Sequence, residues 1–185
     1  EAEMAQSADG CVVVVLGSEA KAKESKSTPA WVKGVGFAND SATLESREWV
    51  YAEYARLAAQ MAYRQAGIRE PVSQIGLFEV DDTYAYKELQ HLIALGLYAR
   101  PEDAGRAVER GDTTPEGSTP TNVSGGALGM GLTLEASGLY RIVELVLHLR
   151  GQAGPRQLQN IKVGLAQSWR GVPTTSGAVV ILSSE

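Results

Sequence analysis

The chain has 185 residues, of which 44% are hydrophobic and 21% are charged, enough for one sizeable domain with a buried core. A net charge of −5 and a pI near 5.2 argue against a nucleic-acid-binding protein, which needs a basic face. No apolar run reaches the roughly 18 residues that a membrane helix requires. Because the start (EAEMAQSADG) lacks a secretory signal and the single Cys11 cannot form an internal disulfide, we expect a cytoplasmic protein.

The first half of the chain predicts strands that alternate with helices. A β-branched run between two glycines, CVVVVL at 11–16, predicts a buried strand in which Cys11 is an inert packing residue. The charged EAKAKE stretch at 19–24 predicts a short, solvated helix capped by Ser18. Further strands are predicted at 31–37 and 75–80, and helices at 49–66 and 83–97.

The second half predicts two helices, followed by two strands that close the chain. A short helix is expected at 101–111 and an amphipathic one at 134–150, with an apolar stripe of Leu139, Ile142, Val143, Val146 and Leu149. The closing strands are expected at 161–166 and 178–182, with Trp169 and Arg170 in the loop between them. This alternation of strands and helices predicts an α/β layered domain.

A glycine-rich loop precedes the second of these helices, in the stretch NVSGGALGMGLTLEASG at 122–138. Glycine lets the backbone come close to a ligand, and N–H groups at the start of a helix can face a developing negative charge. The alternative is that the glycines only form a tight turn before the helix. The residues concerned are Ser124, Gly125, Gly126, Gly129 and Gly131.

Four segments, in chain order, carry a family pattern: SADGCVVVVLGSEAKAKE at 7–24, EVDDTYAYKELQHLIALGL at 79–97, the 120–154 segment that contains the glycine loop, and KVGLAQSWRGVPTTSGAVVIL at 162–182. They resemble the C-terminal half of the thiolase superfamily, particularly the sterol-carrier-protein-type and archaeal thiolases. The resemblance implies a thiolase-like layered α/β fold, in which the C-terminal half has a mixed five-stranded sheet covered by helices. It assigns residues 1–28 to the last strand and helix of the N-terminal thiolase domain, and residues 29–185 to the C-terminal domain.

The chain departs from the family at the positions that usually do chemistry. The histidine of the family's GHP motif falls on Leu132, the histidine of its HDCF motif falls on Asp81, and the cysteine of HDCF falls on Thr83. Leucine cannot accept a proton or activate a thiol. By resemblance, the nucleophilic cysteine lies in the N-terminal half, outside this sequence.

Other residues are therefore candidates for acid–base catalysis. Asp81 ends an apolar strand, where a partly desolvated carboxylate can exchange protons near neutral pH, and Glu135 from the glycine loop is a candidate partner. Tyr84 and Tyr86 are candidate donors. The alternative for Asp81 and Glu135 is that they are ordinary charges in the first turn of a helix.

The resemblance also implies a substrate-binding set: Asp82, Thr83, Ser124, Gly125, Gly126, Gly131, Leu132, Trp169 and Arg170. Arg170 suits a coenzyme A phosphate or a substrate carboxylate, although a surface arginine beside a packed tryptophan fits the sequence equally well. His91 and His148 lie within predicted helices without a second ligand at metal spacing, so we expect structural or surface roles and no metal site.

The function implied is thiolase-type acyl transfer, in which a carbon–carbon bond of an acyl-CoA thioester is formed or cleaved, with no bound cofactor. One alternative is a non-catalytic structural subunit, and another is a thiolase-like retro-aldolase acting on a β-hydroxyacyl-CoA. We expect an N-terminal thiolase half as partner, on another chain or by association into a homo- or hetero-oligomer. By family, a zinc-ribbon/OB-fold acyl-CoA-binding protein is a further expected partner.

Overall fold

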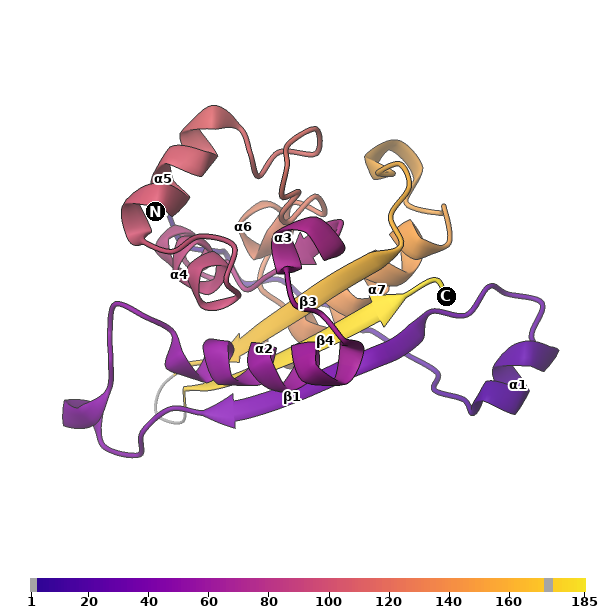
Figure 1. Cartoon of the computed structure of the whole chain (residues 1–185), viewed down its shortest axis with the longest axis horizontal. Coiled ribbons are helices and arrows are strands. Elements are labelled where there is room, and N and C mark those ends of the chain that lie inside the picture. The colour runs from indigo at the N-terminus through magenta and orange to yellow at the C-terminus, as the bar shows by residue number, and fades with distance from the viewer. Residues whose placement is uncertain (1–2, 172–174) are drawn as a thin grey trace.

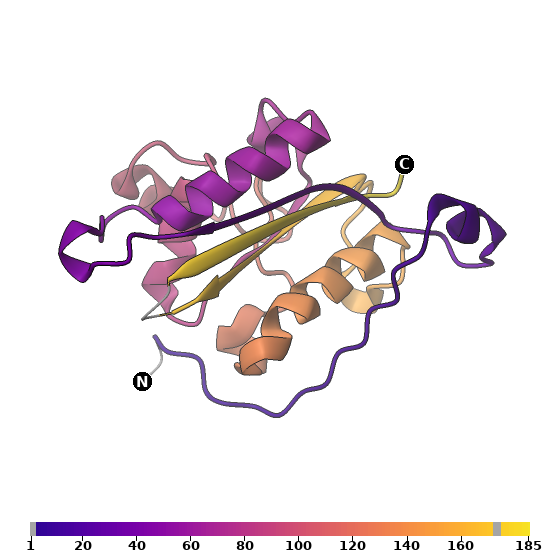
Figure 2. The same cartoon turned by 90° about the horizontal axis from the view of Figure 1, so that it is seen from below.

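A single mixed sheet forms the centre of the molecule, as the computed structural model shows for residues 3–171 and 175–185 (Figure 1). The strand order is β1-β4-β3-β2, with β1 (Trp31–Asn39) antiparallel to β4 (Ser176–Ser183) and β4 antiparallel to β3 (Val163–Arg170). The short β2 (Leu77–Glu79) lies parallel to β3. Helices cover both faces of this sheet, with α2 on one side and α7 on the other (Figure 2). The α/β layered fold is thus confirmed.

The described residues form four strands, so the expected fifth strand is wrong as a regular element. At the free edge of β2, a single parallel bridge joins Thr121 to Phe78. The N–H of Phe78 donates to the carbonyl of Pro120 at 2.9 Å, and the N–H of Asn122 donates back to the carbonyl of Phe78 at 2.8 Å. This pairing extends the sheet by one position only, and it fixes the start of the glycine loop beside β2.

Residues 11–16, predicted as a buried strand, form no strand within this chain. These residues have no regular secondary structure, and Cys11 is exposed, as are Val13 (80%) and Val15 (89%). The stretch runs apart from the sheet before it reaches α1 (Glu19–Glu24) (Figure 2). A strand needs a neighbour to pair with its backbone, and no strand among the described residues pairs with this segment.

Small residues allow α2 (Glu53–Ala66) to pack very closely on the sheet. If Gly34 carried a Cβ, that atom would lie 2.2 Å from the carbonyl oxygen of Ala62. A Cβ on Gly36 would lie 1.8 Å from the carbonyl oxygen of Ala58. Only glycine fits at these two positions of β1. The helix begins four residues later than predicted and ends, as expected, before Gly67, whose φ of +70° suits a helix C-terminus.

Most of the remaining helices lie within the predicted segments but are shorter. The predicted 83–97 and 134–150 helices become α4 (Ala85–Ala94) and α7 (Ser137–Leu149), and a 3₁₀ turn, Leu134–Ala136, precedes α7. The other elements are α3 (Pro71–Gln74), α5 (Pro101–Arg110), α6 (Gly126–Met130) and two 3₁₀ turns, Leu44–Ser46 and Gly154–Arg156. Trp169 and Arg170 lie in β3, not in the predicted loop.

The buried face of α7 differs from the predicted apolar stripe. Leu139 is 40% exposed, whereas the buried set includes Arg141, Glu144 and His148 beside Leu145 and Leu149. An apolar core of Leu77, Leu145, Leu149, Ala166 and Leu182 lies between α7 and the sheet. The polar residues of α7 thus lie at a protein interior, where they need partners.

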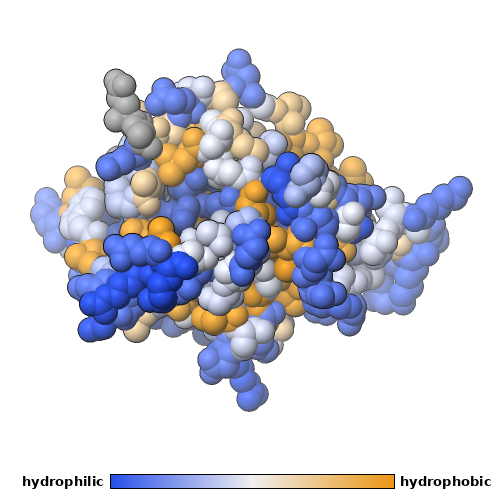
Figure 3. All heavy atoms as spheres, turned by 90° about the horizontal axis from the view of Figure 1, so that it is seen from above, coloured by the Kyte–Doolittle hydropathy of each residue, from blue (hydrophilic) through white to orange (hydrophobic). Residues whose placement is uncertain are grey.

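Among the described residues, no helix is both long and apolar enough to cross a membrane. On the face shown in Figure 3, hydrophobic side chains lie in patches between hydrophilic ones.

Candidate active site

The candidate site lies where β2 ends, between the glycine loop and the N-terminal half of α7. Asp81 and Asp82 follow β2 after one residue, Val80, and both are almost fully buried, with 2% and 1% of their surface exposed. Arg141 reaches them from α7 and is itself only 5% exposed. Burial of three charged groups in one place is costly unless they neutralise one another.

Arg141 supplies the neutralising charge. Its Nη2 lies 3.0 Å from Oδ2 of Asp81 and 3.7 Å from Oδ1 of Asp82. Its Nε donates to the carbonyl of Val80 at 3.1 Å, so the guanidinium also holds the backbone at the end of β2. Sequence reasoning missed Arg141. The available signal was an arginine at helical spacing from Glu144 and His148, in a helix otherwise rich in leucine and valine.

Asp82 holds the glycine loop in place. Its Oδ1 accepts the N–H of Ala127 at 2.7 Å, and its Oδ2 accepts the N–H of Leu128 at 3.2 Å, so the carboxylate caps α6. Gly126 has a φ of +60°, and an added Cβ there would lie 1.9 Å from Oδ2 of Asp82. Burial raises the pKa of Asp82, while these N–H groups and Arg141 oppose the rise. The first N–H groups of α6 therefore face an internal carboxylate.

A second carboxylate, Glu79, lies inside β2 and bonds to Ser124. The hydroxyl of Ser124 donates to Oε2 of Glu79 at 2.6 Å, and the N–H of Ser124 donates to Oε1 at 3.2 Å. The N–H of Gly126 in turn donates to Oγ of Ser124 at 3.1 Å. Glu79 is fully buried, and burial raises its pKa to about 7 although the Ser124 bonds oppose the rise. A glutamate inside the apolar run IGLFEV was the sequence signal for this residue.

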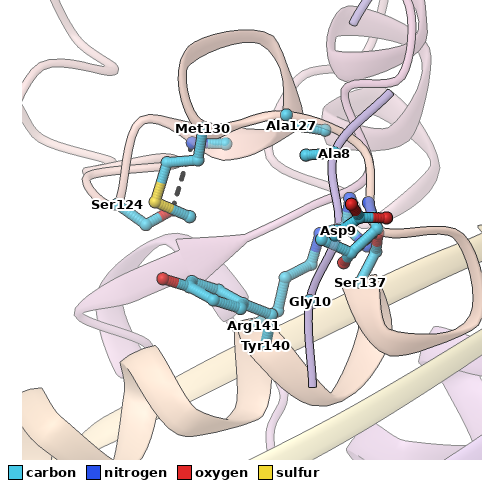
Figure 4. A pocket seen from close by; sticks show the side chains of 12 residues that line it. Ala8, Asp9, Gly10, Ser124, Ala127, Met130, Ser137, Tyr140 and Arg141 are labelled. Atoms are coloured by element: carbon cyan, nitrogen blue, oxygen red, sulfur yellow. Dashed lines mark hydrogen bonds between the residues drawn. The ribbon is translucent and has the colours of Figure 1, made fainter. Parts of the chain in front are cut away.

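A cavity of about 170 Å³ lies beside this polar cluster (Figure 4). Ser124 faces it from the glycine loop, and Tyr140 and Arg141 face it from α7 (Figure 4). The full lining is Ala8, Asp9, Gly10, Ser124, Gly126, Ala127, Met130, Gly131, Thr133, Ser137, Tyr140 and Arg141. The cavity thus combines one buried cation, the carboxylate of Asp9, several hydroxyl groups and an apolar wall.

The N-terminal stretch forms one wall of this cavity. The N–H of Leu132 donates to the carbonyl of Gln6 at 2.8 Å, and the N–H of Ala8 donates to the carbonyl of Leu132 at 3.0 Å. Gly131 has a φ of +99°, and an added Cβ there would lie 2.5 Å from Cβ of Ala8. The Leu132 position thus contacts the N-terminal stretch through its backbone.

The structure brings only part of the predicted site together. Ser124, Gly126 and Gly131 line the cavity, with Gly125 next to them at a φ of +99°. Asp81, Asp82, Tyr84 and Glu135 do not belong to this lining in the part of the chain that the structure describes. Glu135 is exposed on its 3₁₀ turn, and the observed ion-pair partner of Asp81 is Arg141.

The other predicted residues lie around the start of α4 and the end of β3. The N–H of Thr83 donates to Oδ1 of Asp81 at 3.1 Å, and the ring of Tyr84 stacks on that of Tyr86 with centroids 5.8 Å apart. Trp169 is half-buried, and its ring lies 4.5 Å from Nζ of Lys87. Arg170 is exposed at the end of β3.

His91, which the sequence analysis set aside as structural or surface, supports the Asp81 backbone from α4. Its Nδ1 lies 2.8 Å from the carbonyl oxygen of Asp81, so this nitrogen carries the proton and donates. Its Nε2 then accepts from the hydroxyl of Tyr54 at 2.9 Å. Burial lowers the pKa of His91 to about 4, which leaves the ring neutral at neutral pH. The histidine is thus a structural donor in this network.

No group of three or more His, Cys, Asp or Glu residues suited to hold a metal ion occurs within residues 3–171 and 175–185.

Comparison with known proteins gives consistent matches. Residues 36–184 match the family model described as thiolase C-terminal domain-like. The chain is 34% identical over 163 residues to sterol carrier protein 2 of Bos taurus, covering 85% of this chain and 30% of that protein. It is 33% identical over 176 residues to the acetyl-CoA acetyltransferase of Methanothermobacter thermautotrophicus, covering 95% of this chain and 45% of that protein. The chain therefore spans less than half the length of either relative.

Two solved structures show the same fold. The structure titled Ltp2-ChsH2(DUF35) aldolase superposes with a TM-score of 0.77 at 27% identity, over 89% of this chain and 42% of that one. Human mitochondrial 3-ketoacyl-CoA thiolase superposes with a TM-score of 0.61 at 22% identity, over 91% of this chain and 34% of that one. The resemblance inferred from sequence motifs is thus confirmed.

Proposed function

Because the chain belongs to the thiolase C-terminal domain-like family, we propose that it is the C-terminal half of a protein that forms or cleaves a carbon–carbon bond in an acyl-CoA thioester. The observation that carries the proposal is the glycine-loop cavity, fixed in place by the buried cluster of Asp81, Asp82 and Arg141. A rigid polar frame around a small cavity is what positioning of a reactive group requires.

The size and lining of the cavity suit a short acyl group. A volume of about 170 Å³ holds a few carbon atoms, so the much larger coenzyme A moiety would extend outside it. The hydroxyl groups of Ser137 and Tyr140 line the cavity and can bind oxygen atoms of a substrate, whereas Ser124 donates its proton to Glu79. The name of the archaeal relative specifies acetyl-CoA for that protein, and a coenzyme A thioester is the substrate class proposed here.

A second candidate, retro-aldol cleavage of a β-hydroxyacyl-CoA, is favoured by the residues at two family positions. Leu132 and Thr83 occupy the places of the GHP histidine and the HDCF cysteine in the sequence match, and neither can act as a general base at neutral pH. Retro-aldol cleavage needs no acyl-enzyme and therefore no activated cysteine. The similarity to a solved aldolase at a TM-score of 0.77 points in the same direction.

The proposal keeps the residue roles expected from the sequence as predictions. Asp81, Tyr84 and Glu135 are its proposed acid–base residues, and the binding set named above, including Trp169 and Arg170, is proposed to contact the thioester. Residues 1–28 are proposed to belong to the N-terminal thiolase domain, which supplies the rest of the site. The protein is also proposed to form an oligomer, to bind a zinc-ribbon/OB-fold acyl-CoA-binding partner and to be located in the cytoplasm.

The test uses the whole protein from its native source. It is incubated with a β-ketoacyl-CoA plus coenzyme A, and separately with a β-hydroxyacyl-CoA, and mass spectrometry follows both the thioesters and the intact protein. A shortened acyl-CoA together with an acylated protein supports the thiolase reaction. A shortened acyl-CoA from the β-hydroxy substrate without any acylated protein supports the aldolase. No binding and no product would leave a structural subunit as the function.

A further inference from the structure

We propose that Ser124 is a catalytic residue that passes a proton between a substrate oxygen in the cavity and the buried carboxylate of Glu79. The inference rests on the retro-aldol form of the proposed function, because a β-hydroxyl group is the substrate oxygen that must lose a proton. The inference supplies a proton acceptor for this reaction. Leu132 and Thr83, which replace the family's histidine and cysteine, cannot accept that proton.

The geometry places Ser124 between the cavity and the carboxylate. Ser124 lines the cavity, and its hydroxyl donates to Oε2 of Glu79 at 2.6 Å. The second oxygen of Glu79 is fixed by the N–H of Ser124 at 3.2 Å, so one residue orients both carboxylate oxygens. Glu79 is fully buried and does not line the cavity. Any proton exchange between Glu79 and a bound substrate would therefore pass through Ser124.

The hydroxyl is also held for this role from its other side. The N–H of Gly126 donates to Oγ of Ser124 at 3.1 Å. This bond leaves one lone pair of the oxygen to accept a proton from the cavity, while the hydroxyl proton stays directed at Glu79. A donor fixed on Oγ also stabilises negative charge that develops on it during transfer.

The charges around Glu79 allow it to take up and release a proton near neutral pH. Burial and, to a smaller extent, Glu144 on α7 raise its pKa, the hydrogen bonds from Ser124 and the charge of Arg141 lower it, and the net pKa is about 7. Arg156, in the 3₁₀ turn after α7, also interacts electrostatically with Glu79, but its ion-pair partner is Glu144, at 2.9 Å. A general base with a pKa close to the working pH is the efficient choice.

The proposed step balances as follows. The β-hydroxyl of the substrate gives its proton to Oγ of Ser124, and the original Ser124 proton moves to Oε2 of Glu79. The hydroxyl carbon becomes a carbonyl as the bond between Cα and Cβ breaks, and the bonding electron pair remains on the thioester fragment as an enolate. In the condensation direction, the same proton returns from Glu79 through Ser124 to the new oxygen.

The test compares Glu79→Gln, Ser124→Ala and Ser124→Thr in the whole protein, with cleavage of a β-hydroxyacyl-CoA measured between pH 5 and 9. Glu79→Gln keeps a hydrogen-bonding side chain of the same shape, so the fold should persist. We expect Glu79→Gln and Ser124→Ala to lower kcat by about 100-fold or more and to remove the loss of rate below about pH 7. Ser124→Thr keeps the hydroxyl, so this variant should retain much of the wild-type kcat. It should also retain the loss of rate below about pH 7, the acidic limb of the pH profile.

The matched control is Glu88→Gln, because Glu88 is a half-buried carboxylate that also has a raised pKa, and its partner, Asn122 at 2.8 Å, is an amide outside the cavity lining. This variant should keep the acidic limb. Infrared spectroscopy supplies a readout independent of turnover: a protonated carboxyl band that titrates near pH 7 and disappears in Glu79→Gln.

The outcomes separate the two proposals. If the wild-type protein cleaves the substrate but Glu79→Gln or Ser124→Ala retains both its rate and its acidic limb, the relay is overturned and the aldolase function stands. If the wild-type protein cleaves no β-hydroxyacyl-CoA, the function fails and the relay falls with it, whatever the infrared titration shows.

Discussion

Arg141 of α7 and Asp81 at the end of β2 form a buried ion pair, with 3.0 Å between Nη2 and Oδ2 and side-chain exposures of 5% and 3%. The pair joins two elements that are 60 residues apart in the sequence, and Asp82 shares the same guanidinium at 3.7 Å. Because Asp82 also caps α6, one arginine fixes both the end of β2 and the glycine loop. The position of the cavity wall therefore depends on this residue.

Arg141→Met should destabilise the protein strongly, because it leaves Asp81 and Asp82 buried without a countercharge. Removal of one partner from a buried ion pair costs about 3–5 kcal/mol. Urea denaturation of the whole protein at pH 7 measures the loss. The control is Arg100→Met, since Arg100 pairs with Asp103 at the surface with 64% of its side chain exposed, and its midpoint should match the wild type. Equal midpoints for both variants would show that the cluster is not needed for folding.

Gly126→Ala should also destabilise the protein, because its methyl group would lie 1.9 Å from Oδ2 of Asp82 and its φ is +60°. Backbone strain and the displacement of Asp82 together predict a loss of about 3 kcal/mol or more. The matched control is Gly105→Ala in α5, where an added Cβ meets no atom within 4 Å. That change should raise stability by about 0.5–1 kcal/mol, as usual for alanine in a helix. Thermal unfolding of the two variants side by side decides the matter, and a neutral Gly126→Ala would refute the close approach.

The folding stability should depend on pH through Glu79. Its pKa is raised from 4.5 to about 7 in the folded state, so the folded protein binds the proton more tightly than the unfolded chain does. Its contribution is complete below about pH 4.5 and is lost as the pH rises from there to about 7, by about 3 kcal/mol in all. Because the Glu79→Gln side chain does not titrate, the stability difference between the wild type and this variant should change by about 3 kcal/mol between pH 4.5 and 7. A constant difference from pH 4.5 to 7 would contradict the raised pKa.

Glu144 should act in the opposite direction and at lower pH. Burial works against its charged form, but the hydrogen bonds from Arg156 and the neighbouring His148, 3.3 Å away, lower its pKa to about 2. A lowered pKa means that its stabilisation is present above pH 4.5 and is lost as the pH falls towards 2. Glu144→Gln should therefore cost stability at pH 6 and much less at pH 2.5, as measured by urea denaturation. A cost that does not change between these pH values would contradict the lowered pKa.

The sequence predicted best those elements whose ends are set by local residues. Gly67 and Gly111 adopt φ values of +70° and +80° at the ends of α2 and α5, where the glycines predicted helix ends. The buried face of α7 was not predictable in this way, because Arg141 is stabilised by carboxylates from a distant strand. Periodicity counts apolar residues, and so it cannot identify a polar residue whose partner lies elsewhere in the fold.

The family motifs located the candidate site, but they did not identify the groups that hold it together. They pointed to Asp81, Asp82 and the glycine loop, which the structure brings within reach of Arg141. Glu79 was passed over because it belongs to a strand that reads as pure core. Its bond to Ser124 depends on the three-dimensional fold, in which the bridge between Phe78 and Thr121 lies at the start of the loop.

The exposed N-terminal stretch gives a last prediction, about the proposed N-terminal thiolase half. Val13, Val15 and Leu16 are each at least 80% exposed here, a costly arrangement for a β-branched run in water. If residues 11–16 pair with the sheet of an N-terminal thiolase domain, Cys11 should be shielded in the whole protein. Its thiol should then react slowly with a disulfide reagent in the native state and rapidly in urea. A variant with Val13→Asp, on the same stretch, should weaken the association and speed the native reaction. Equally fast labelling of the native and unfolded protein would show that the segment stays outside any sheet.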